Sequence, residues 1–226
     1  MQPVHTAWLI FLLPLLVVHG AWLWSSMAGA IDWCLPYWSG CTSISRAARS
    51  SDALFLFRAV MTFNAALLVS YWLHVSHYLA LYSAPKTATR PLNIIGITGA
   101  IFLVLYANFL GSDGDFYQLL RRYGVTIYFS FTVLAQMLFL RQLLLRFPAK
   151  PVWITYKTWL SVGLLLLGLT SVFCNALLTG DARDRWENII EWHFALGMNS
   201  YFLFSALLWH HTGYSLQARS ALPTPK

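Results

Sequence analysis

Long apolar stretches separated by short polar connectors dominate the sequence. Six of them are about 20 residues long, the length that an α-helix needs to cross the hydrocarbon core of a bilayer. They cover roughly 7–27, 54–81, 92–110, 125–145, 158–178 and 189–211. Their apolar residues run continuously instead of alternating with polar ones, which predicts helices and argues against a barrel of strands. The sequence therefore predicts an all-α fold, a polytopic membrane bundle of six transmembrane helices.

The same pattern predicts a single domain over residues 1–216. We expect an extracytoplasmic loop with a short helix over 28–53, and a disordered cytoplasmic tail over the polar, proline-containing residues 217–226. The first apolar stretch lacks the basic start of a signal peptide and is longer than its apolar part, so we interpret it as a retained span. Within 113–123, apolar residues recur at helical spacing, which predicts either a short surface helix or a cap over the bundle.

Composition supports a membrane location. The 226 residues are 58% hydrophobic and 10% charged, whereas soluble domains carry about 25% charged residues. So little soluble chain leaves no basis for a nucleic-acid partner, although the net charge is +7. We expect a multi-pass membrane protein, in the inner membrane if the source is bacterial and in an endomembrane if it is eukaryotic.

Lysine and arginine are divided unevenly between the two ends of the predicted helices. The connectors at one end, together with the chain termini, hold eight basic residues and no acid: Lys86, Arg90, Arg141, Arg146, Lys150, Lys157, Arg219 and Lys226. The opposite end holds six: Arg46, Arg49, Arg121, Arg122, Arg183 and Arg185. Because cytoplasmic loops are enriched in lysine and arginine, we expect both termini in the cytoplasm and the 28–53 loop outside.

Polar residues near the predicted outer end are the main candidates for function. Arg58 begins the second predicted span and Glu191 begins the sixth, so each is the natural partner of the other. They form either an ion pair that fixes the bundle or part of a polar pocket for a lipid headgroup, for which arginine is suited because it binds phosphate bidentately. The candidate headgroup-binding residues are Ser43, Ser45, Arg46, Arg58, Glu191 and Asn199. Alternatively, the serines only cap a helix that begins there.

Two other functions fit the sequence. His19 and His193 are expected near the outer end and His74 and His210 near the inner end, an arrangement that a haem-binding electron carrier uses for two layers of axial ligands. The other alternative is a non-enzymatic scaffold or assembly factor, with a protein partner at the 28–53 loop. Whether the chain catalyses a reaction stays open.

The remaining residues of interest give no metal or cofactor motif. A zinc site built from the inner histidines lacks an HExxH sequence, and the acids lie at the other end. Outside the haem alternative we therefore predict no cofactor and no metal. Cys34 and Cys41 form a disulfide if their loop faces an oxidising compartment, or they remain free thiols.

A short motif resembles a known family. The segment Thr42-Ser-Ile-Ser-Arg-Ala-Ala48, ahead of Arg58, is similar to the lumenal Ser-Ile-Ser motif of the FRAG/DRAM/SFK-like membrane proteins. Glu191-Trp192 with Asn199 and Phe202 is similar to the last span of that family. This family includes the damage-regulated autophagy modulators and the post-GPI-attachment remodelling proteins. The resemblance implies a six-span protein that handles or remodels membrane lipids.

Overall fold

Eight helices make up the part of the chain that the computed structural model describes, residues 1–216, and no strand occurs there. The long helices are α1 (Pro3–Met27), α4 (Ala53–Leu81), α5 (Lys86–Phe109), α6 (Asp115–Arg146), α7 (Val152–Leu177) and α8 (Gly180–His211). Two short helices, α2 (Pro36–Ser39) and α3 (Ile44–Arg49), lie in the loop between α1 and α4. The predicted disordered tail, 217–226, lies outside the described residues.

Five of the long helices, all except α8, are long and apolar enough to cross a membrane. α8 has 32 residues, and its first two turns are rich in charged side chains. α7 leaves most of its apolar side chains uncovered, as expected for a helix facing lipid. Its exposed apolar residues include Trp159, Leu165, Leu166, Leu169, Val172, Phe173 and Leu177.

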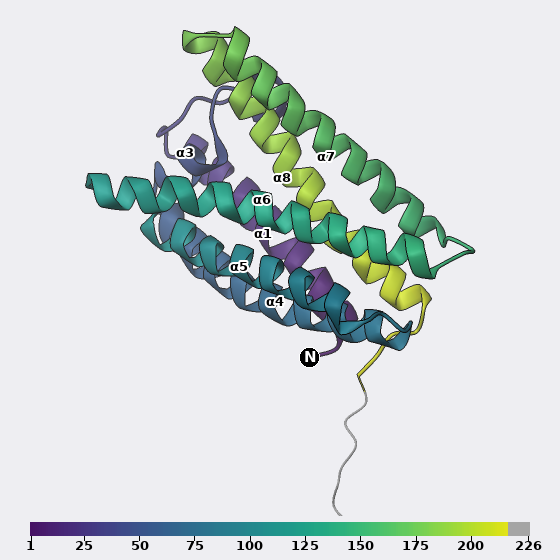
Figure 1. The fold of residues 1–226 in the computed structure, drawn as a ribbon. Helices are drawn as coiled ribbons and strands as arrows, with labels where there is room; N and C mark the ends of the chain where they lie inside the picture. Colours follow the sequence, from purple (N-terminus) through teal and green to yellow (C-terminus); the bar gives the residue numbers. More distant parts are fainter. Residues whose placement is uncertain (217–226) are drawn as a thin grey trace, which may run out of the picture.

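The helices form two groups that α1 joins (Figure 1). α4, α5 and α6 pack side by side in chain order, α7 packs along α8, and α1 lies between α4 and α8. α6 runs across the front of the bundle and makes few contacts with α7 and α8. The side chain of Gln2 donates to the carbonyl of Leu216 at 3.1 Å and accepts from its amide at 3.1 Å. The two ends of the described chain therefore lie together at one end of the bundle.

Glycines allow the closest helix contacts in the first group. A Cβ at Gly96 on α5 would collide with the indole ring of Trp72 on α4. A Cβ at Gly124 on α6 would lie 2.8 Å from the backbone nitrogen of Tyr106 on α5. Small residues at such positions let helix backbones approach closely and gain packing contacts in a membrane.

Several helices begin before the predicted spans, and α8 starts at Gly180 instead of at about residue 189. The segment 113–123 is not a separate surface helix, because α6 runs without interruption from Asp115. α5 starts at Lys86, several residues before the predicted span, and continues through Pro91. α7 begins directly after Pro151, so Lys157 lies in its second turn and not in a connector. Each boundary moves outward because polar or charged residues extend a helix beyond its apolar part.

Candidate functional site

The loop between α1 and α4 is held onto α8 by specific contacts. A disulfide joins Cys34 and Cys41, whose Cα atoms are 6.5 Å apart. Of the two alternatives from the sequence, the structure therefore has the disulfide and not the two free thiols. The Asn188 side chain donates to the Gly40 carbonyl at 2.8 Å, and the Trp192 indole donates to the Thr42 carbonyl at 2.9 Å. These bonds fix the loop as a cap over the end of the bundle.

α3 sits in this cap with its N-terminus facing α8. Ser43 is its N-cap, and its hydroxyl accepts a hydrogen bond from the Arg46 amide at 3.1 Å. On the other side, Ser25 of α1 donates to the Ala47 carbonyl at 2.7 Å. Ser43 thus has the helix-capping role that serine commonly takes at this position, and Arg46 projects from an exposed position.

Arg58 does not pair with Glu191, contrary to the pairing expected from the sequence. Its Nε donates to the carbonyl of Leu110 at 3.1 Å, its Nη2 donates to the same carbonyl, and Nη2 also reaches the Ser112 hydroxyl at 3.3 Å. These acceptors lie at the end of α5 and in the turn that leads to α6, where backbone carbonyls lack helical partners. Arg58 therefore closes this turn, and it does not line the cavities around Glu191 described below.

Glu191 lies where three cavities meet. One is a depression of about 710 Å³ between α6 and α8, also lined by Ser45, Arg121 and Arg122. A second, of about 560 Å³, extends from Glu191 towards Ser171 on α7. Both volumes include space open to the outside, and both fall within the range of about 300–1,000 Å³ typical of ligand sites. The third cavity leads from Glu191 into the bundle.

Four arginines surround the first depression and its rim. Arg121 and Arg122 line it, and Arg49 on α3 lies close enough to Arg121 and Arg46 for their charges to lower its pKa, with burial as the larger cause. None of these four arginines forms an ion pair within residues 1–216, where both ion pairs are made by Arg183. Arginines that outnumber the one acidic side chain of the depression, Glu191, repel each other, so an anion in this place would be bound favourably.

The third cavity connects Glu191 with Asn199, one of the candidate residues. It is lined by apolar side chains of α1, α4 and α8, among them Pro14, Phe57 and Met61. Asn199 uses its amide to donate to the Phe11 carbonyl at 2.6 Å. Of the predicted headgroup residues, the cavities thus bring together Ser45, Glu191 and Asn199.

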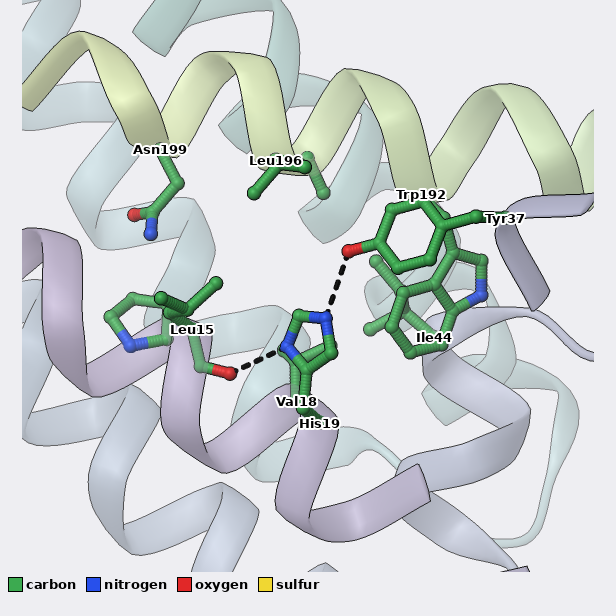
Figure 2. Close-up of a pocket in the computed structure, with 10 residues that line it drawn as sticks. Leu15, Val18, His19, Tyr37, Ile44, Trp192, Leu196 and Asn199 are labelled. Carbon is green, nitrogen blue, oxygen red and sulfur yellow. Dashed lines mark hydrogen bonds between the residues drawn. The ribbon is translucent and has the colours of Figure 1, made fainter. Parts of the chain in front are cut away.

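A fourth cavity, which shares Asn199 with the third, is lined by a pair formed by His19 and Tyr37 (Figure 2). His19 Nδ1 lies 2.7 Å from the Leu15 carbonyl, which can only accept, so Nδ1 carries the proton. Nε2 of the neutral ring then accepts from the Tyr37 hydroxyl at 2.9 Å. Burial raises the pKa of the Tyr37 phenol, which keeps it in this donor state. The pair lines this cavity with an oriented hydrogen bond.

The remaining histidines of the haem alternative have separate surroundings. His193 Nδ1 bonds to the Ile189 carbonyl at 2.9 Å, and the Tyr37 ring packs against both His193 and His19. His74 bonds to Ser70 at 3.2 Å, and His210 is exposed. Since both ring nitrogens of His19 are occupied, an axial ligand there would have to break two hydrogen bonds. Groups of three or more metal-ligating side chains are absent from residues 1–216.

Sequence reasoning missed one buried charge. Lys157 is fully enclosed, and its Nζ donates to the Ser205 hydroxyl at 2.6 Å and the Tyr201 carbonyl at 3.2 Å. Nζ also lies 3.3 Å from the centroid of the Tyr201 ring. Ser205 bonds to the Tyr71 hydroxyl at 2.6 Å. The missed signal was Pro151, which commonly precedes a helix and places Lys157 inside one.

Comparisons with known proteins add no relative to this description. No protein-family model matches the chain, and neither a curated protein nor a solved structure matches it at a significant level. The functional argument therefore rests on the geometry of the site.

Proposed function

We propose that this chain is a multi-pass membrane protein that binds a phospholipid in the opening between α6 and α8. In this proposal Arg121 and Arg122 hold the phosphate, and the apolar cavity below Glu191 receives part of an acyl chain. The observation that carries the proposal is the group of arginines that form no ion pair within residues 1–216, beside a cavity with an apolar interior. The proposal is that the protein binds lipid, as the family resemblance led us to expect, and it includes no chemical step.

The membrane arrangement in the proposal has α8 as the sixth span. Adjacent chain ends require an even number of crossings, and five helices already qualify by length and composition. α8 runs along α7 and supplies the sixth crossing, while its charged first turns project from the outer surface. The Cys34–Cys41 disulfide supports an oxidising, extracytoplasmic side for the 28–53 loop. The distribution of lysine and arginine favours the same orientation.

Arginine is the residue type that suits this ligand. Its guanidinium stays charged and donates parallel hydrogen bonds to phosphate oxygens. Arg121 is partly buried and Arg122 is exposed, both in the first two turns of α6. Phe116, Leu119 and Tyr123, in the same turns, are exposed apolar residues. We infer that this part of α6 lies at the level of the headgroups, where apolar and basic side chains serve together.

The route for an acyl chain follows from the packing of α6. Because α6 makes few contacts with α7 and α8, the depressions beside Glu191 open sideways between these helices. A lipid can then enter from the bilayer without leaving it. The lining changes from Arg121 and Arg122 at the opening to Phe57, Met61 and Met198 inside. This order matches the order of headgroup and chain in a phospholipid.

Native mass spectrometry tests the proposal. The purified protein is titrated with phosphatidylethanolamine and phosphatidylglycerol of identical acyl chains, and the bound fraction gives an affinity. We expect Arg121→Gln with Arg122→Gln to weaken the binding of both lipids at least tenfold, because each removes charged hydrogen bonds of about 1.5–3 kcal/mol. The matched control is Arg90→Gln with Arg141→Gln, which alters two exposed arginines at the other end of the bundle.

Equal lipid binding by the Arg121/Arg122 variant and the wild type would overturn the proposal. So would a wild type that binds neither lipid, or a control pair that weakens binding as much as the Arg121/Arg122 variant does. Thermal unfolding of each variant in detergent shows whether a loss of binding reflects a loss of fold.

A further inference from the structure

We infer that the site selects phospholipids whose phosphate is followed by a primary amine, a zwitterionic headgroup of the ethanolamine type. This inference rests on the proposed function and adds the headgroup class. It derives from the second depression beside Glu191. The phosphate of the proposed lipid binds in the first depression, so the second is free for the rest of the headgroup.

The two open depressions adjoin each other and differ in the charged side chains that line only one of them. They share two lining residues, Glu191 and Phe129. Arg121 and Arg122 line only the first depression, Glu187 lines only the second, and Glu191 lies between them. A ligand that fills both depressions therefore meets a positive wall and then a negative one. A phosphate followed by an ammonium group two carbons away presents its charges in the same order.

Glu191 has no cationic partner among residues 1–216. The ion pairs there use Asp184 and Glu187, both with Arg183. The backbone N–H groups of Ile44 and Ser45 approach its carboxylate from the N-terminus of α3. Glu187 lies one turn before Glu191 on α8, and two carboxylates at this spacing repel each other. A cation bound between them would relieve that repulsion and would supply the charge that the protein lacks at this point.

The lining favours a primary ammonium over a quaternary one. A primary ammonium has three N–H donors, and both carboxylates and the neighbouring Ser171 hydroxyl can accept from it. A quaternary ammonium cannot donate and instead needs aromatic faces around it. The aromatic residues here, Phe129 and Phe194, pack edge to face on each other at 5.8 Å. They therefore form one wall of the depression and not a cage.

The test compares headgroups on the intact protein. Phosphatidylethanolamine, phosphatidylcholine and phosphatidylglycerol with the same acyl chains are titrated separately in native mass spectrometry. We expect the wild type to bind the ethanolamine lipid about tenfold more tightly than the other two, as one charged hydrogen-bond contact would give. Glu191→Gln keeps the size of the side chain and removes its charge. It should reduce the preference to twofold or less, and thermal unfolding in detergent checks that the variant is folded.

The controls separate the two proposals. Asp113→Asn, an exposed acid in the turn before α6, should keep the tenfold preference. Soluble glycerophosphoethanolamine in excess should displace less than half of the bound lipid, because the apolar cavity holds the chain; complete displacement would show a site for the free headgroup. Equal affinity of the wild type for all three lipids would overturn this inference and leave the proposed function standing. Absence of binding by any of the three would overturn the proposed function itself.

Glu187→Gln serves as a second variant if Glu191→Gln does not fold. It removes the other carboxylate of the same depression and should reduce the preference by a smaller factor, about threefold, because Arg183 already pairs with it. An unchanged preference in every folded variant of Glu187 and Glu191 would refute the assignment of the amine to this depression.

Discussion

Two groups of charged side chains lie within the helices of this protein, and they differ in how the charge is satisfied. Lys157 is fully enclosed, and its ammonium group donates to Ser205 and Tyr201. Arg121, Arg122 and Glu191 line open cavities, and none of the three forms an ion pair within the described chain. A buried polar group that is hydrogen-bonded within the bundle contributes to packing, whereas charged groups left open towards a cavity remain available to a ligand.

The difference follows from which helices enclose each group. Lys157 projects from α7 into the contact between α7 and α8 and lies 5.0 Å from the centroid of the Phe139 ring on α6. The arginines lie at the opposite part of α6, where α6 has little contact with α8. α6 therefore covers one charged group and leaves the other open. This difference between the two groups leads to predictions, which follow in order of decreasing effect on stability.

Removal of the Lys157 side chain should have the largest effect on stability. We expect Lys157→Ala to lower the free energy of unfolding by about 3 kcal/mol, because it creates a cavity and removes two hydrogen bonds. Lys157→Met keeps the volume and should lose less than about 1.5 kcal/mol, since a buried charge can often be replaced by an apolar side chain. Denaturant-induced unfolding in detergent measures both, with the exposed Lys150→Ala as control.

Lipid titration of the same variants tests whether Lys157, unlike Arg121 and Arg122, has no part in lipid binding. Folded Lys157→Met should bind phospholipid as tightly as the wild type. A variant with wild-type stability and weakened lipid binding would instead show that Lys157 belongs to the binding site, and the contrast between the two groups would fail.

The sequence predicts local features of this protein well and tertiary partners poorly. The apolar stretches located all six long helices, because helix formation in a membrane depends on local hydropathy. The partner of Arg58 could not be predicted in this way, since it depends on how α4 and α5 pack and on where α5 ends. Arg121 and Arg122 were assigned to a connector because the charged start of α6 is not apolar. Their role depends on the continuation of α6 as one helix.

Tyr37, which lines the cavity beside Asn199, should show an intermediate effect on stability. Tyr37→Phe removes the hydrogen bond to His19 and should lower the free energy of unfolding by about 1 kcal/mol at neutral pH. The pKa of this phenol is raised in the folded protein, so its contribution is fully present below pH ~10, the ordinary value for tyrosine, and declines as the pH rises above it. Stability measured from pH 8 to 11 should therefore decline less steeply in Tyr37→Phe.

The exposed Tyr117→Phe is the control for this measurement. It should follow the wild-type pH dependence closely. Identical alkaline slopes for wild type and Tyr37→Phe would show that the phenol of Tyr37 does not depend on burial or on His19 for its state.

Arg121→Gln should have the smallest effect on stability, and its direction is informative. A surface charge that contributes to packing would lower stability when removed, but Arg121 lies close to Arg49 and shares no ion pair within residues 1–216. We expect the free energy of unfolding to rise by a few tenths of a kcal/mol at low ionic strength, because repulsion between the arginines is reduced. The rise should vanish in 0.5 M salt, which screens charges beyond a few ångströms.

A loss above about 1 kcal/mol would mean that Arg121 is structural in the same sense as Lys157. A small gain in stability together with a large loss of lipid affinity is the combination expected of a side chain whose charge serves a ligand, since binding sites commonly retain groups that the fold alone would not favour.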